Sequence, residues 1–197
     1  PAYFKMHLLA FGESVPLSTT FPALRRAFVR GTGLVPGEHQ VALVAKTREH
    51  TIRAAVLNCF EDTLPEAGLE AMTVSPNLLV NVTNDAWFAG TQESELHLRI
   101  ATMRAIETRR DLVRAVNEGA TSWVDATGLV RARYAGPVPG TLPTTPALLE
   151  GNTVVVRLGD FAGLLLLGLL AIATWRGIRS TQKRNGAPPD TGERAAS

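Results

Sequence analysis

The feature that most constrains the fold is an alternation of strand and helix patterns through residues 40–125. Short apolar, β-branched runs bounded by turn residues predict strands, and longer segments with apolar residues at helical spacing predict helices. Strands are predicted at 41–45, 51–58, 78–83, 112–117, 121–125 and 129–134, and helices at 24–29, 61–71 and 93–110. Because strands and helices alternate, we expect a layered α/β domain rather than an all-β one.

The only cysteine, Cys59, stands where a predicted strand ends and a predicted helix begins. A thiol at such a junction can be exposed, and the N-terminus of the helix favours its thiolate form. The alternative is that a lone cysteine is a small buried hydrophobic residue, which the local sequence by itself slightly favours. One cysteine excludes an internal disulfide, and four scattered histidines without metal-ligand spacing predict no metal site.

The C-terminal part combines an apolar segment with a basic flank. Residues 154–175 are strongly apolar, interrupted only by Arg157 and Asp160, and residues 161–175 carry no charge. The segment is apolar on every face and basic residues follow it at once, which is typical of a membrane span rather than of the alternative, a buried core helix. We therefore predict a transmembrane helix at 154–176. The basic residues that follow the apolar segment are Arg176, Arg179, Lys183 and Arg184.

These features predict three regions, with an α/β domain at 1–150, the membrane helix at 154–176, and a basic, disordered, cytoplasmic tail at 177–197. A cytoplasmic basic flank places the α/β domain on the opposite, outer face of the membrane. A free thiol in that oxidising compartment is more easily explained by catalysis than by packing. The net charge of +2 owes much to the C-terminal basic residues and does not indicate a nucleic-acid partner.

Several segments together resemble motifs of the apolipoprotein N-acyltransferases. Residues 3–17 resemble the family's Y-x-K-x-H-L-V-P-F-G-E-x-x-P segment, residues 58–61 its C-Y/F-E nucleophile segment, and residues 81–88 its N-x-T-N-D-A-W-F segment. Residues 97–107 resemble its Q-H-x-x-x-A-R-x-R-A-x-E helix, and residues 157–161 resemble its R-x-G-D-W/F segment. The matches run in order along the chain, and their combination is highly specific.

The resemblance implies the C-terminal portion of a nitrilase-like domain, a four-layer αββα sandwich whose N-terminal part is missing here. The first residues, from Pro1 on, already read as the middle of a domain, which agrees with that expectation. Four positions depart from the family's pattern, and none is the matched nucleophile or lysine. They are Ala10, Leu96, Thr102 and Glu118.

The resemblance also implies a Glu-Lys-Cys triad. Cys59 matches the nucleophile and Lys5 the lysine, whereas the glutamate that serves as general base lies upstream of the lysine in the family and is absent here. Glu13 matches a second glutamate near the site, and Phe60 and Glu61 match the two positions after the cysteine.

The residue types suit acyl transfer by themselves. A thioester mechanism needs a thiolate, a base, and positive charge where the oxyanion develops. The ammonium of Lys5 can supply that charge, and Glu13 can position it and keep it protonated. The alternatives are that Lys5 and Glu13 form a solvated surface pair, and that Glu61 is merely an acidic residue in the first turn of a helix.

A second set of residues is predicted to bind substrate. Trp87 and Phe88, on a loop beside a lipid-using site, can contact acyl chains or the membrane interface. The alternatives are that the aromatic residues belong to the core and that the polar residues before them form an Asx turn. The predicted substrate-binding residues are Phe60, Asn84, Asp85, Trp87 and Phe88.

The function implied by the resemblance is N-acyl transfer at the bacterial cytoplasmic membrane. A fatty acyl chain would move from a membrane phospholipid, through a cysteine thioester, to the N-terminal S-diacylglyceryl-cysteine of a lipoprotein, with no cofactor and in a monomer. The alternatives are a nitrilase- or amidase-type hydrolase of a small amide and a degenerate, non-catalytic homologue. Because the base and most membrane helices are expected elsewhere, we predict that the 197 residues alone are inactive.

Overall fold

The computed structural model describes residues 1–18, 20–21, 23–24, 34–136, 138–159 and 161–185. The chain divides into two compact units, Pro1–Arg157 and Leu158–Ser197. Nearly all of the helix predicted at 24–29 lies outside the described residues.

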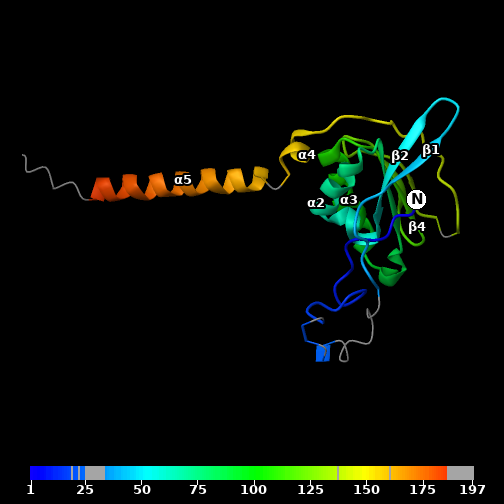
Figure 1. Ribbon diagram of the computed structural model, residues 1–197, viewed down its shortest axis with the longest axis horizontal. Helices are drawn as coiled ribbons and strands as arrows, with labels where there is room; N and C mark the ends of the chain where they lie inside the picture. The colour runs from blue at the N-terminus through cyan, green and yellow to red at the C-terminus, as the bar shows by residue number, and fades with distance from the viewer. Residues whose placement is uncertain (19, 22, 25–33, 137, 160, 186–197) are drawn as a thin grey trace, which may run out of the picture. The chain divides into compact units, whose positions relative to one another are not determined.

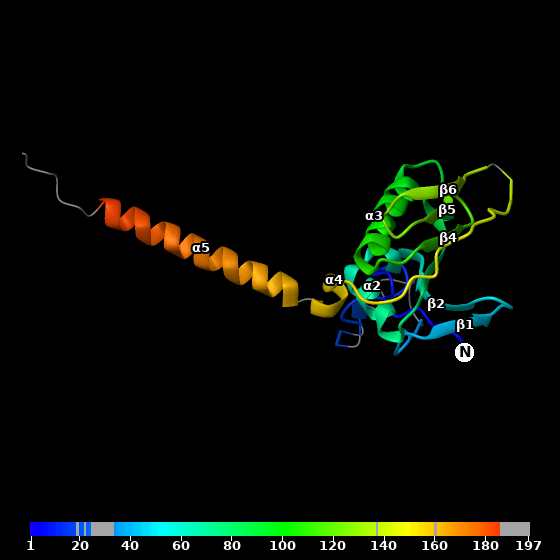
Figure 2. The ribbon, with the colours of Figure 1, turned by 90° about the horizontal axis from the view of Figure 1, so that it is seen from above.

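The first unit is built on a six-stranded mixed sheet with the strands in chain order, β1 to β6 (Figure 2). The central strands β2, β3 and β4 are parallel, and β1, β5 and β6 are antiparallel to their neighbours. A layered α/β domain is thereby confirmed. The strands are β1 Ala42–Lys46, β2 Thr51–Asn58, β3 Leu78–Thr83, β4 Leu112–Val116, β5 Thr121–Val124 and β6 Val130–Tyr134.

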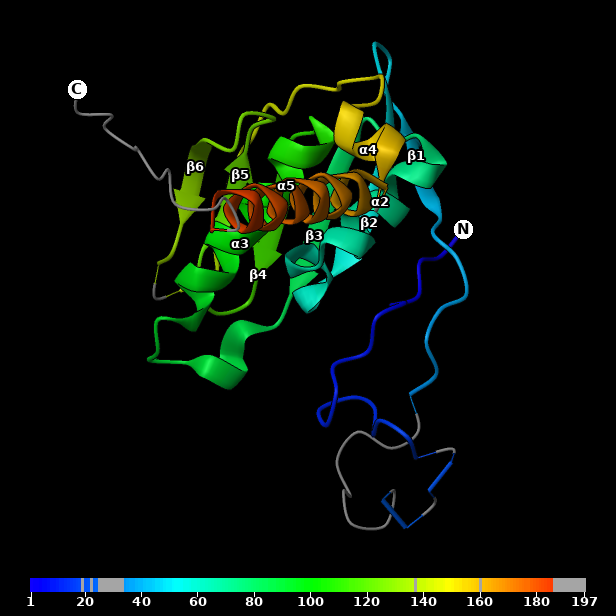
Figure 3. The same ribbon diagram turned by 90° about the vertical axis from the view of Figure 1, so that its left-hand side faces the viewer.

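Two helices, α2 Pro65–Ala71 and α3 Glu93–Thr108, cover one face of the sheet (Figure 1 and Figure 3). Small residues on the helices, among them Ala71 and Ala105, pack on Leu57 and Leu79 of the strands and form the buried core. On the opposite face Val82 is 53% exposed. The described residues therefore contain two layers, a sheet and its helices, and not the four layers of the predicted sandwich.

The predicted helix at 61–71 begins later than expected. Residues Cys59–Thr63 form a 3₁₀ turn, η1, and Leu64 is extended before Pro65 opens α2. Proline is favoured at the first position of a helix, because a backbone N–H there would have no partner within the helix and proline lacks this group. Pro65 therefore places the start of α2 after the 3₁₀ turn. Glu61 therefore lies in η1, outside α2. A further 3₁₀ turn, η2, spans Met72–Val74 after α2.

The predicted single helix at 154–176 is wrong in its bounds. A short helix, α4, spans Val154–Leu158, and α5 spans Phe161–Asn185, with Gly159 in the left-handed backbone region at φ +51° between them. Helix α5 also continues into the predicted disordered tail, whose residues from 186 on lie outside the described part. Among the described residues, no helix has the length and apolar character needed to cross a membrane.

The α5 helix has exposed apolar side chains along much of its length. In the last part of this stretch, the Arg179 guanidinium lies 3.9 Å from the centre of the Trp175 ring, a cation–π contact one helical turn apart. The large apolar residues exposed on this helix include Phe161, Leu164, Leu165, Leu166, Leu167, Leu169, Leu170, Ile172, Trp175 and Ile178.

Candidate active site

Cys59 occupies a strained backbone position at the end of a parallel strand. It follows β2 directly and has φ +56°, a left-handed conformation that costs a non-glycine residue about 1 kcal/mol or more. The Asn81 side-chain amide, on the neighbouring strand β3, donates hydrogen bonds to the carbonyl oxygens of Leu57 (2.8 Å) and Cys59 (2.9 Å). The half-buried thiol therefore sits on a turn that the adjacent strand holds in place.

The carboxylate of Glu61 binds the N-terminal segment to the cysteine turn. It is fully buried, and its Oε1 accepts hydrogen bonds from the backbone N–H groups of Met6 (2.7 Å) and His7 (2.9 Å). Its Oε2 accepts from the Asn58 N–H (2.6 Å) and the Tyr3 hydroxyl (2.8 Å). Burial, together with the bond to Glu61, raises the pKa of Tyr3. Glu61 therefore positions the segment that carries Lys5. It also stands in the first turn of η1, as the alternative predicted, where it accepts from the Asn58 N–H in a capping box.

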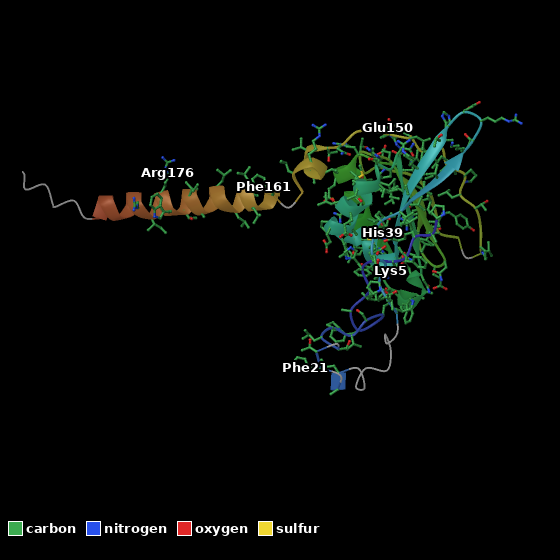
Figure 4. The ribbon with its side chains drawn as sticks, viewed as in Figure 1. Lys5, Phe21, His39, Glu150, Phe161 and Arg176 are labelled. Carbon is green, nitrogen blue, oxygen red and sulfur yellow. The ribbon has the colours of Figure 1, made fainter. Side chains whose placement is uncertain are left out.

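Lys5 lies on this segment, and Figure 4 labels its position. Its Nζ is 2.6 Å from Oε2 of Glu13 and 5.0 Å from the centre of the Phe60 ring. The same Glu13 oxygen accepts a hydrogen bond from the Leu9 N–H (2.8 Å). Because the Lys5 side chain is only 10% exposed, the pair is not the solvated surface pair considered as an alternative.

The loop after β3 presents two aromatic side chains to solvent. Trp87 is 75% exposed and Phe88 46% exposed on the 3₁₀ turn η3, Asp85–Phe88, so neither belongs to the core of the described unit. Asn84 accepts a hydrogen bond from the Ala86 N–H (3.2 Å), which is the Asx turn considered above, and another from the Asn117 side chain (2.7 Å). The loop borders a cavity of about 690 Å³.

A smaller hollow of about 520 Å³ lies against Phe60, the residue after the cysteine. Its lining combines six apolar residues with His7 and Ser14, and it presents polar and apolar surface in about equal measure. The lining residues are Met6, His7, Leu8, Ser14, Leu34, Pro36, Phe60 and Leu64.

A buried group of charged side chains lies beside the same turn, and of its members only Asp85 was a predicted site residue. His97 Nε2 is 2.6 Å from Asp62 Oδ1, and Arg114 Nε is 3.1 Å from Asp62 Oδ2. Asp85 joins them through His97 Nδ1 (3.2 Å) and Arg114 Nη2 (3.5 Å). Asp85 also accepts hydrogen bonds from Thr83 and Ser94. Its two oxygens are therefore occupied within the protein, which fits a positioning role better than the predicted direct contact with substrate.

The same group contains the one set of described residues close enough to share a metal ion, Asp85, Glu93 and His97. Both ring nitrogens of His97 already face carboxylate oxygens at hydrogen-bond distance. A ring that donates on both sides has no lone pair for a metal, so the geometry favours a hydrogen-bonded ion network.

Sequence comparison gives one consistent set of relatives. No protein-family model matches the chain. The chain is 34% identical to the apolipoprotein N-acyltransferases of Geobacter metallireducens, over 86% of this chain and 32% of that protein, and of Shewanella oneidensis, over 85% and 32%. It is 37% identical to that of Bdellovibrio bacteriovorus, over 64% of this chain and 23% of that protein.

Among solved structures, a carbon-nitrogen hydrolase from Helicobacter pylori G27 aligns with a TM-score of 0.49 at 14% identity, covering 68% of this chain and 47% of that one. An amidase from Nesterenkonia sp. AN1 aligns with a TM-score of 0.42 at 18% identity, covering 66% and 46%. The chain spans about a third of the length of the curated relatives it matches. By sequence, the chain is homologous to the apolipoprotein N-acyltransferases and corresponds to about one third of their length.

Proposed function

We propose that this chain carries the nucleophile and the oxyanion-stabilising lysine of a lipoprotein N-acyltransferase with a nitrilase-like catalytic domain. The observation that carries the proposal is the bond network of Glu61, which holds the Lys5 segment against the turn of Cys59. The names of the sequence relatives agree with this chemistry.

The first half-reaction is attack of the Cys59 thiolate on the ester carbonyl of a phospholipid acyl chain. The C–S bond forms as negative charge develops on the carbonyl oxygen, and the Lys5 ammonium, held by Glu13, stabilises that charge. Collapse of the tetrahedral intermediate breaks the C–O bond and leaves a thioester on Cys59. The general base, the glutamate that the family carries upstream of the lysine, takes the proton of the Cys59 thiol and, once protonated, delivers it to the departing lysophospholipid oxygen.

The second half-reaction is attack of the acceptor's α-amine on the thioester. A C–N amide bond forms, the C–S bond breaks, and the proton lost by the amine returns the thiol. The acceptor is the N-terminal S-diacylglyceryl-cysteine of a lipoprotein. The hollow beside Phe60 offers space next to the nucleophile, with apolar side chains such as Leu8 and Leu64 in its lining.

The protein acts as a monomer at the bacterial cytoplasmic membrane, with the catalytic domain on the outer face. Two observations support a lipid environment. Trp87 and Phe88 expose aromatic surface on the loop after β3. Helix α5 exposes a long series of apolar side chains and carries Arg176 and Arg179 near the end of that series.

The experiment is an intact-mass measurement on the full-length protein after incubation with phospholipid in detergent. We expect a mass increase of one acyl chain, removable by hydroxylamine and absent in Cys59→Ala. The matched control is Thr73→Ala, a change at an exposed residue away from the cysteine turn, which should acylate like the wild type. Folded wild-type protein without any adduct would contradict the proposal and favour a small-amide hydrolase or a non-catalytic homologue.

A further inference from the structure

His97 bridges two parts of the site that lie on different elements. It projects from α3, is only 4% exposed, and has Asp62 of η1 on one ring nitrogen and Asp85 of η3 on the other. Asp62 lies three residues after the nucleophile, and Asp85 opens the turn that presents Trp87. The imidazole is therefore the link between the cysteine turn and the aromatic loop.

The charge state of the ring fits a bridge of this kind. Burial alone lowers the pKa of His97, but the hydrogen bonds to Asp62 and Asp85 outweigh burial and the nearby Arg114 and raise it to about 9. At neutral pH the ring is a cation with an N–H on each side, and it donates to both carboxylates. A neutral ring would place a nitrogen lone pair against one of them.

Two other charged side chains lie around the ring. Arg114, from β4, pairs with the same two carboxylates on their remaining oxygens. Glu93, one turn before His97 on α3, lies 3.8 Å from Nδ1, and burial followed by the charge of Asp85 raises its pKa. Asp62 and Asp85 are thus each held by two cations, so loss of the His97 proton removes one of the two charges that hold each carboxylate.

We propose that His97 is a positioning residue that locks the cysteine turn to the aromatic loop, so that the thiol and the lipid-contacting side chains of Trp87 and Phe88 keep one geometry during acyl transfer. This inference rests on the proposed acyltransferase function. Its specific content is that the protonated ring acts through Asp62 and Asp85 and does not touch the substrate.

The first test compares His97→Gln with His50→Gln in the full-length protein. Glutamine keeps donor capacity but cannot carry charge or bridge both carboxylates, and His50 is an exposed histidine on the β1–β2 turn. The rate of Cys59 acylation at saturating phospholipid should fall about 100-fold in His97→Gln, as expected for a misplaced reacting group, and stay unchanged in His50→Gln. The phospholipid concentration for half-maximal rate should change less than about 3-fold, because binding groups remain.

The second test follows the pH dependence of the same rate. The wild-type rate of Cys59 acylation should fall as pH rises through about 9, where His97 releases its proton. In Asp62→Asn the fall in rate should occur at lower pH, because one of the hydrogen bonds that raise the pKa of His97 is weakened. Asp85→Asn provides the same measurement if Asp62→Asn does not fold. A purely structural role would lower the rate without moving the pH profile.

The outcomes separate this inference from the function on which it rests. Wild-type protein that forms no thioester contradicts the acyltransferase function itself. If the wild-type protein acylates and folded His97→Gln acylates equally fast, the positioning role alone is overturned. The same holds if the wild-type protein acylates and the fall in rate at alkaline pH stays at the same pH in the aspartate variants.

Discussion

Replacing Glu61 by glutamine should weaken the attachment of the N-terminal segment that carries Lys5 to the turn of Cys59. The carboxylate accepts four hydrogen bonds, from the N–H groups of Met6, His7 and Asn58 and from the Tyr3 hydroxyl. A glutamine side chain offers one acceptor oxygen, so two of the four donors would face its NH₂ group instead. Hydrogen bonds to a charged group contribute about 1.5 kcal/mol each at the lower end, so Glu61→Gln should cost about 3 kcal/mol.

The assay is reversible urea unfolding of the full-length protein in detergent, with the acylation rate of Cys59 measured in parallel. Glu66→Gln is the matched control, because Glu66 is an exposed glutamate on the adjacent helix α2. We expect Glu61→Gln to lose both stability and acylation, and Glu66→Gln to lose neither. If Glu61→Gln unfolds with the free energy of the control and acylates normally, the argument that Glu61 holds the Lys5 segment is refuted.

Four other changes test separate parts of the site. Asn81→Leu removes two hydrogen bonds to the cysteine turn and should destabilise the protein by about 2 kcal/mol, measured by urea unfolding. Lys5→Met keeps the apolar stem but loses the charge, and should slow Cys59 acylation at least about 100-fold. Because the change leaves the carboxylate of a largely buried pair without its cation, the unfolding free energy should also fall by about 1–3 kcal/mol. The folded-state pKa of His97 is above its ordinary value, so its stabilising contribution is complete below about pH 6.5 and is lost as pH rises through about 9. Melting temperatures from pH 6 to 10 should show that loss in the wild type and lack it in His97→Gln. Trp87→Ala should change stability by less than about 0.5 kcal/mol because the side chain is exposed, yet weaken binding to phospholipid vesicles measured by flotation.

Local sequence patterns predicted the sheet well and the site only in part. Strands β2 and β3 match their predicted bounds, 51–58 and 78–83, because apolar β-branched runs between turn residues are a local signal. The 3₁₀ turn at Cys59–Thr63 was predicted as helix, since such a turn has no distinct residue pattern. Pro65 was the available signal that the helix begins later.

The residues missed by sequence reasoning depend on contacts between distant segments. Asp62 had no predicted role, and its partners His97 and Arg114 lie on later elements. Periodicity reports only which face of an element is apolar, so it cannot pair charges across elements. Asn81 was the exception that could have been found, because a polar residue inside the apolar strand 78–83 is expected to have a buried partner.

Two consecutive buried carboxylates explain how the strained turn of Cys59 is maintained. Glu61 binds the N-terminal segment, and Asp62 binds α3 and β4 through His97 and Arg114. A left-handed backbone at a non-glycine residue persists only where the surroundings over-determine it, and here two independent sets of bonds do so immediately after the cysteine. The same bonds bring the lysine segment to one side of the turn and tie the aromatic loop to the other. The hydrogen bonds and ion pairs that maintain the strained backbone of Cys59 therefore also position the other residues of the site. Variants that relax the turn should lose acylation before they lose the fold.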